Sequence, residues 1–121
     1  LEQVFINLVS NAIDAMDEKE KRPEFSDKEK RLTIRSFAEN DHVSVKVIDT
    51  GIGMSEDVKN KIFEPFYTTK KVGRGTGLGV SISYGIIQDY KGSIEIESEV
   101  GKGTAFTIKF PQANKLELHN G

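Results

Sequence analysis

Cysteine and tryptophan are absent from this chain of 121 residues, and proline occurs only three times. The lack of cysteine excludes a disulfide framework and a thiolate metal site, and it makes a reducing compartment, the cytoplasm, the default location. The sequence also lacks an excess of basic charge, because 17 Lys and Arg stand against 19 Asp and Glu. That balance disfavours nucleic acid as a partner, since such binding usually needs a clustered basic surface.

Long hydrophobic runs are missing as well, and no apolar stretch approaches the roughly 18 residues that span a bilayer. We expect no direct membrane contact by this segment, while a longer parent protein could carry an anchor. The chain opens at Leu1 inside a helical pattern and without an initiator methionine, so we expect an N-terminally truncated fragment. The hydrophobic share of 36% and the charged share of 30% favour one soluble domain, which we place at residues 1–110 with a loose tail over 111–121.

Hydrophobic periodicity predicts both helices and strands. The first half is predicted to hold a helix over 1–16, a charged loop over 17–30, and strands around 32–34 and 43–47 with a turn at 39–42. A helix over 56–62, capped by Ser55, follows, and then a helix that the Gly-rich stretch 73–79 opens and that runs to about 91 and stops at Gly92. The last predicted elements are strands around 94–96 and 106–110 with a turn at 101–103. This order predicts an α+β fold, a two-layer sandwich with helices on one face of a mixed, largely antiparallel sheet.

The polar side of the first predicted helix is rich in amides. Gln3, Asn7, Asn11 and Asp14 fall on one stripe that is roughly 80° wide and holds no Lys or Arg. Buried amides need hydrogen-bond partners, which a ligand or a metal could supply. A water-bridged structural stripe is the alternative.

A second pattern, Asp49-Thr50-Gly51-Ile52-Gly53-Met54, directly follows a predicted strand. A carboxylate beside bare backbone suits the exocyclic amine of a purine, and the glycines would let a flat ring approach closely. A turn that binds no ligand is the alternative.

A third pattern, Gly73-Arg74-Gly75-Thr76-Gly77-Leu78-Gly79, precedes a predicted helix. Free backbone N–H groups and the helix dipole favour an anion such as phosphate there. Thr68, Thr69, Lys70 and Lys71 add hydroxyls and cations just before it. The pattern is neither a P-loop nor a dinucleotide fingerprint, and a flexible linker with ordinary surface charge is the alternative.

Five motifs follow one another in a diagnostic order, namely Asn7-x-x-x-Asn11, Asp49-x-Gly51-x-Gly53, Phe63-x-x-Phe66, Gly75-x-Gly77-x-Gly79 and Gly101-x-Gly103-Thr104. This set resembles the nucleotide-binding boxes of the GHKL ATPase superfamily. Phe-Glu-Pro-Phe-Tyr-Thr-Thr-Lys together with Gly-Thr-Gly-Leu-Gly is specifically similar to the catalytic and ATP-binding domain of sensor histidine kinases. The resemblance runs from residue 1 to about residue 110.

The resemblance implies a Bergerat-type fold that binds ATP and Mg²⁺ between its helices and a lid. Asn11 would ligate Mg²⁺, with Asn7 and Lys70 as the other catalytic residues, while Asp49 would bind the adenine amine and Thr104 would lie near the purine. Phe63 and Phe66 would anchor the lid. The implied nucleotide contacts are Asn7, Asn11, Asp14, Asp49, Gly51, Gly53, Met54, Phe63, Phe66, Thr68, Thr69, Lys70, Arg74, Gly75, Thr76, Gly77, Leu78, Gly79 and Thr104.

Superfamily members that hydrolyse ATP place a Glu where this chain has Asn7, and an amide cannot act as a general base. The resemblance therefore implies transfer of the γ-phosphoryl group to a histidine on a separate dimerisation domain, and from there to a response regulator. We expect His42 and His119 to be ordinary surface histidines, and the isolated fragment to be a monomer that binds ATP without phosphorylating itself. A GHKL-type ATPase clamp, a protein serine kinase or anti-sigma regulator, and a catalytically inactive nucleotide-sensing module remain alternatives.

Overall fold

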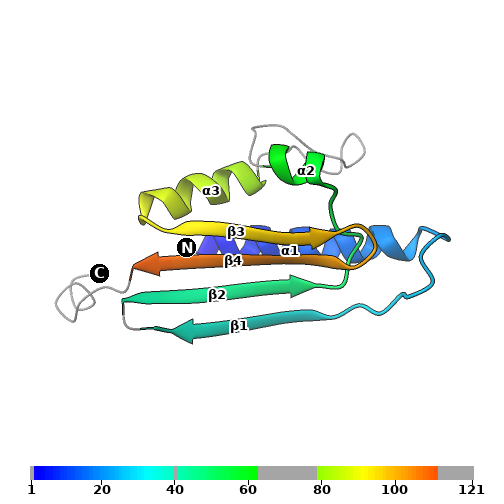
Figure 1. The fold of residues 1–121 in the computed structure, drawn as a ribbon, viewed down its shortest axis with the longest axis horizontal. Coiled ribbons are helices and arrows are strands. Elements are labelled where there is room, and N and C mark those ends of the chain that lie inside the picture. The colour runs from blue at the N-terminus through cyan, green and yellow to red at the C-terminus, as the bar shows by residue number, and fades with distance from the viewer. Residues whose placement is uncertain (1, 40, 63–78, 112–121) are drawn as a thin grey trace.

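The computed structural model describes residues 2–39, 41–62 and 79–111, and their elements follow the predicted order (Figure 1). The chain runs through α1 (Glu2–Glu20), β1 (Leu32–Ala38), β2 (His42–Asp49), α2 (Glu56–Lys61), α3 (Gly79–Asp89), β3 (Ser93–Glu99) and β4 (Gly103–Pro111). The strands form one sheet in the order β1-β2-β4-β3, and every described pair is antiparallel. The α+β prediction is confirmed, although the described part of the sheet has no parallel pair that would make it mixed.

Helices α1 and α3 share one face of the sheet, and the core lies where they meet the two central strands. Its buried members are Val4, Leu8, Val47, Ile87, Phe106 and Ile108. Side chains alternate between the two faces of a strand, so the apolar positions of β2 and β4 point toward the helices. Burying each of these side chains stabilises the fold by roughly 1.5–3 kcal/mol, and this burial orients α1 on the sheet. The opposite face carries charged side chains, among them Lys109 and Glu95 at 3.5 Å.

Helix α1 extends beyond its predicted end and continues to Glu20. The prediction of a loop from residue 17 was wrong because residues 17–20 are all charged and carry no apolar periodicity. Lys19 is nevertheless only 5% exposed, since a lysine can bury its aliphatic stem while its ammonium group finds a partner. Here Lys19 Nζ donates to the carbonyl of Thr50 at 3.4 Å. The helix ends shortly before Pro23, which disfavours helical backbone in the residue before it.

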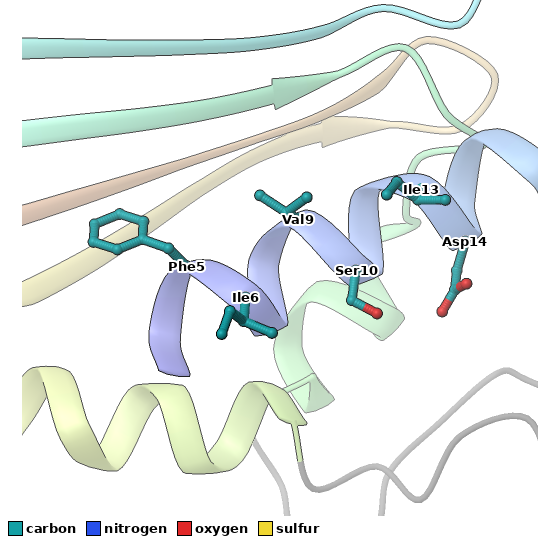
Figure 2. A pocket seen from close by; sticks show the side chains of 6 residues that line it. All are labelled: Phe5, Ile6, Val9, Ser10, Ile13 and Asp14. Atoms are coloured by element: carbon teal, nitrogen blue, oxygen red, sulfur yellow. The ribbon is translucent and has the colours of Figure 1, made fainter. Parts of the chain in front are cut away.

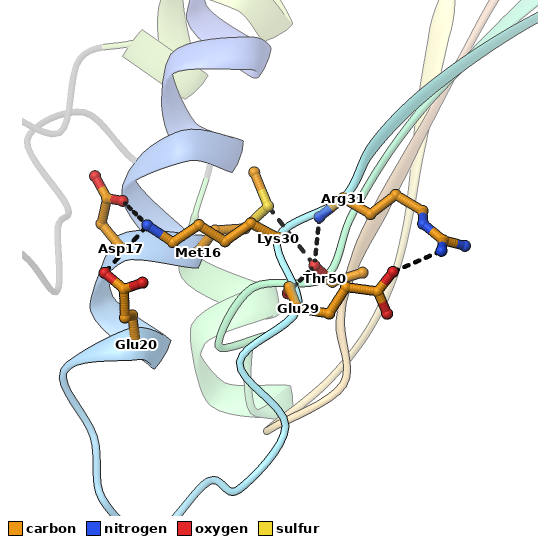
Figure 3. A network of polar contacts seen from close by, with 7 residues as sticks. All are labelled: Met16, Asp17, Glu20, Glu29, Lys30, Arg31 and Thr50. Atoms are coloured by element: carbon orange, nitrogen blue, oxygen red, sulfur yellow. Dashed lines mark hydrogen bonds and ion pairs between the residues drawn. The ribbon is translucent and has the colours of Figure 1, made fainter.

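The connection between α1 and β1 is exposed but tied to the rest of the molecule (Figure 3). Thr50 Oγ1 accepts the backbone N–H of Arg31 at 2.9 Å and donates to the carbonyl of Glu29 at 2.6 Å. Lys30 Nζ lies 2.8 Å from Asp17 Oδ1. The hydrogen bond to Asp17, and to a smaller extent the one to Glu20, raises the pKa of Lys30. The connection thus joins the end of α1 to the residue that follows β2.

The shorter helices also begin and end for local reasons. Ser55 Oγ accepts the backbone N–H of Val58 at 3.3 Å, which confirms the predicted cap of α2. Helix α3 ends at Asp89, short of the predicted stop at Gly92, because Lys91 already takes the left-handed conformation with φ 59°. The predicted tail from residue 112 lies outside the described residues.

Candidate functional site

Three polar side chains lie in a row across one end of the sheet. The register pairs Asp49 of β2 with Thr104 of β4, and Thr104 with Ser98 of β3. They lie on the helix-covered face, because Val47 and Phe106, two positions away on the same strands, belong to the core. The apolar face of the sheet therefore ends in a polar row, which we call the Asp49 row (Asp49, Thr104 and Ser98).

The carboxylate of Asp49 is buried and is held by backbone amides. The residue is 5% exposed, and its Oδ1 accepts the N–H of Gly51 at 2.8 Å. Burial raises the pKa of the Asp49 carboxyl, while backbone hydrogen bonds from Gly51 and Thr104 oppose that shift. A buried carboxylate has more lone pairs than these two amides use, so it can accept a further hydrogen bond from a ligand amine.

The glycines of the turn after Asp49 are required by contacts within the protein. A Cβ on Gly51 would come within 2.7 Å of Ala15, and a Cβ on Gly53 would come within 2.0 Å of the carbonyl oxygen of Glu99. Gly53 also has φ 75°, which favours glycine. Close packing of the turn on α1 and on the β3–β4 end is therefore one reason for these glycines, and the close approach of a ring stays a prediction.

The amide stripe of α1 contacts α3 at Asn7. Gln3 Nε2 donates to Asn7 Oδ1 at 2.8 Å, and Asn7 Nδ2 donates to Ser83 Oγ at 3.2 Å. Asn7, Asn11 and Asp14 are all half-buried, while Ser83 is fully buried. Both polar ends of the Asn7 amide thus have protein partners, so the hydrogen bonding of Asn7 does not by itself require a ligand.

The segment that contains the Asp49 row and the amide stripe matches a known protein family. A family model described as "Histidine kinase-, DNA gyrase B-, and HSP90-like ATPase" matches residues 1–114. The chain belongs to this ATPase family. The resemblance drawn from the five motifs is thereby confirmed.

Sensor kinases are among the relatives of this ATPase-family chain. The sensor kinase CckA of Brucella abortus is 50% identical over 117 residues, which cover 92% of this chain and 12% of that protein. Sporulation kinase E of Bacillus subtilis is 45% identical over 117 residues, which cover 97% of this chain and 14% of that protein. The chain therefore spans only a small part of the curated relatives it matches.

Solved structures share the fold, among them the catalytic domain of a histidine kinase. The catalytic domain of histidine kinase ThkA, in a nucleotide-free form, matches with a TM-score of 0.70 at 37% identity, over 90% of this chain and 65% of that one. Full-length ShkA in complex with AMPPNP matches with a TM-score of 0.71 at 25% identity, over 92% of this chain and 21% of that one. Within the residues described for our chain, the helices fall short of the length and apolar character that a membrane crossing requires.

Part of the predicted site belongs to residues 63–78. Ten predicted contacts lie outside the described residues, namely Phe63, Phe66, Thr68, Thr69, Lys70, Arg74, Gly75, Thr76, Gly77 and Leu78. Gly79 is the first residue of α3. Met54 is half-buried against the core, and its backbone N–H donates to Ser98 Oγ at 2.8 Å.

Sequence reasoning missed Ser98 and Ser83. Ser98 follows Ile94 and Ile96 at the spacing of two that marks the inward face of β3, so a polar residue there was a usable signal. Ser83 contacts Asn7 across 76 positions of sequence, and no local pattern announces that contact.

Helix α1 also has an apolar hollow along its surface (Figure 2). Its lining residues are Phe5, Ile6, Val9, Ser10, Ile13 and Asp14. Ile6 and Ile13 are 58% and 48% exposed, and Asp14 is the one predicted site residue in the lining. The hollow contains no member of the Asp49 row.

Proposed function

We propose that residues 1–110 form the ATP-binding catalytic domain of a sensor histidine kinase, which transfers the γ-phosphoryl group of ATP to a histidine on a separate dimerisation domain. The observation that carries this proposal is the buried Asp49 carboxylate, held by backbone amides at the end of the sheet and in register with Thr104. Family membership and the sensor kinase relatives support the same reading.

At the base end, Asp49 would accept a hydrogen bond from the adenine amine, and Thr104 would contact the same edge of the purine directly or through water. Both side chains belong to strands whose backbone is paired on either side. Binding therefore costs little reorganisation at this end, which favours affinity.

At the phosphate end, Asn11 would offer its amide oxygen to Mg²⁺. An oxygen ligand suits this ion, which usually keeps several waters and binds through one or two protein groups together with substrate phosphates. The described residues contain no cluster of three or more His, Asp or Glu that could hold a metal. Asn7, Lys70 and the glycine amides from Gly75 to Gly79 would contact the phosphates, and catalysis would rest on positioning and charge neutralisation.

The accepting histidine would come from elsewhere in the protein. His42 is exposed and starts β2, while Asp49 ends that strand, so seven residue steps place their backbones about 23 Å apart. The base end of the proposed site is therefore remote from His42, and the family resemblance puts the accepting histidine on a separate domain. We propose a dimerisation and phosphoacceptor domain and a response regulator as partners, and the cytoplasm as the location of this domain.

The test is calorimetric titration of the folded chain with ATP, with and without Mg²⁺. Asp49→Asn replaces one acceptor oxygen by a donor amide, so we expect at least about a 100-fold loss of ATP affinity, because a buried donor would face the adenine amine. Asn11→Asp is expected to alter chiefly the Mg²⁺-dependent part of binding.

Asp89→Asn makes the same chemical change at an exposed position at the end of α3 and serves as the control. It should leave affinity unchanged. A folded parent chain that binds no ATP would sink the proposal. Steady release of inorganic phosphate by the chain alone would favour the GHKL-type ATPase alternative over the kinase.

A further inference from the structure

Ser98 Oγ has three polar neighbours, and two of them have fixed hydrogen-bonding roles. The backbone N–H of Met54 lies at 2.8 Å and can only donate, while the carbonyl oxygen of Gly103 lies at 2.9 Å and can only accept. The third neighbour is Thr104 Oγ1 at 2.7 Å, where either hydroxyl could donate. Ser98 is therefore the junction between the turn after β2, the β3–β4 end and the Asp49 row.

A hydroxyl group has one proton and two lone pairs. The single proton of Ser98 goes to the carbonyl of Gly103, and one of its lone pairs accepts the N–H of Met54. The remaining lone pair faces Thr104, so the hydroxyl of Thr104 must supply the proton of the third bond. The proton of Thr104 is then committed to Ser98, and only lone pairs remain on Thr104 Oγ1.

We propose that Ser98 is a positioning residue that fixes the hydroxyl of Thr104 as a hydrogen-bond acceptor and so helps to determine which base the site accepts. This inference rests on the proposed nucleotide function and adds a residue to it. Asp49, when ionised, is also an acceptor only. If both acceptors face position 6 of the purine, they favour the amine of a 6-aminopurine and disfavour the carbonyl oxygen of a 6-oxopurine, which brings no proton at that position.

The alternative is a purely structural role, in which Ser98 only stabilises the end of the sheet by joining Met54 to Gly103. A purely structural role would lower the affinity for all nucleotides together, through the fraction of folded chain. The ratio of affinities for two bases would stay the same. Discrimination between bases is therefore the readout that separates the two roles.

The experiment measures dissociation constants of ATP and ITP for the parent chain and for Ser98→Ala. ATP has a 6-amino group and a bare N1, whereas ITP has a 6-oxo group and a proton on N1. Without Ser98, the hydroxyl of Thr104 can rotate and donate to a 6-oxo group, so we expect the preference for ATP to fall by about tenfold. Ser98→Thr keeps a hydroxyl and should retain the preference. Ser93→Ala changes an exposed serine at the other end of β3 and should leave it unchanged.

An unchanged preference in folded Ser98→Ala would overturn the inference while leaving the proposed function intact. Loss of ATP and ITP binding by the parent chain would instead overturn the proposed function. A direct measurement needs neither a variant nor a nucleotide: the hydroxyl proton of Thr104 should exchange slowly with water in NMR spectra and show a contact to Ser98. A slowly exchanging Ser98 proton directed at Thr104 would reverse the assignment and overturn the inference.

Discussion

The Asp49 row and the amide stripe of α1 are both polar, but their atoms are held in different ways. In the row, Asp49 and Ser98 bond to backbone amides and carbonyls of neighbouring strands and turns. In the stripe, Gln3 bonds to Asn7, and Asn7 bonds to Ser83 of α3, in both cases between side chains. Backbone partners cannot rotate away, whereas side-chain partners can change rotamer, so we expect the row to be rigid and the stripe to be adaptable.

The largest expected effect tests the rigidity of the turn beside the row. Gly53→Ala would place a Cβ within 2.0 Å of the carbonyl of Glu99 at φ 75°, so we expect a loss of at least about 3 kcal/mol in the free energy of unfolding. The matched control is Gly85→Ala in α3, where a Cβ would meet nothing within 4 Å. It should stabilise the chain by up to about 1 kcal/mol, because alanine favours a helix interior.

Urea unfolding of both variants measures the two changes. Similar stabilities of Gly53→Ala and Gly85→Ala would contradict the expectation, since they would mean that the turn can move aside as easily as the helix surface.

The same difference between local and distant contacts decides how much the sequence could predict. The elements and the hairpins followed from spacing, which is local in sequence, while the assignment of Thr104 to the site came from the family resemblance and stays a prediction. The packing of Gly51 could not be predicted, because its neighbour Ala15 lies on another element. The role of Ser98 likewise depends on a strand register that only the folded β3–β4 hairpin defines.

The helix end was mispredicted for a related reason. Apolar periodicity treats Lys19 as a surface residue, yet its stem is buried and its ammonium group reaches Thr50, the residue that follows β2. A long side chain that is apolar along its stem and charged at its tip escapes any pattern that assigns one polarity to each residue.

A smaller effect tests the stripe. A double-mutant cycle of Asn7→Ala and Ser83→Ala should give a coupling of about 1 kcal/mol in the free energy of unfolding, because the pair shares one part-buried hydrogen bond. The cycle of Gln3→Ala with Asn7→Ala is the control, since that bond is exposed and should couple by only a few tenths, about 0.3 kcal/mol. A larger coupling at Gln3 than at Ser83 would show that the stripe is fixed from its solvent side, contrary to the contrast with the row.

The smallest expected effect is a change of the free energy of unfolding with pH. It should arise in the Asp49 row and not in the stripe amides, because the amides of Asn7 and Asn11 do not titrate and the carboxyl of Asp49 does. Burial raises the pKa of Asp49 in the folded chain above its ordinary value of 3.8, so the folded state holds this proton more tightly than the unfolded state. The contribution of Asp49 to stability is therefore fully present below pH 3.8 and is lost as the pH rises through the raised pKa.

Other carboxyl groups add their own dependence, so the quantity to measure is the difference in the free energy of unfolding between the parent chain and Asp49→Asn, by urea unfolding from pH 4 to 7. The parent should lose stability relative to Asp49→Asn as the pH rises, whereas exposed Asp89→Asn should show no such trend. A difference that grows in the opposite direction would mean that the amides of Gly51 and Thr104 outweigh burial, and the row would then hold its carboxylate as an ionised group that folding favours.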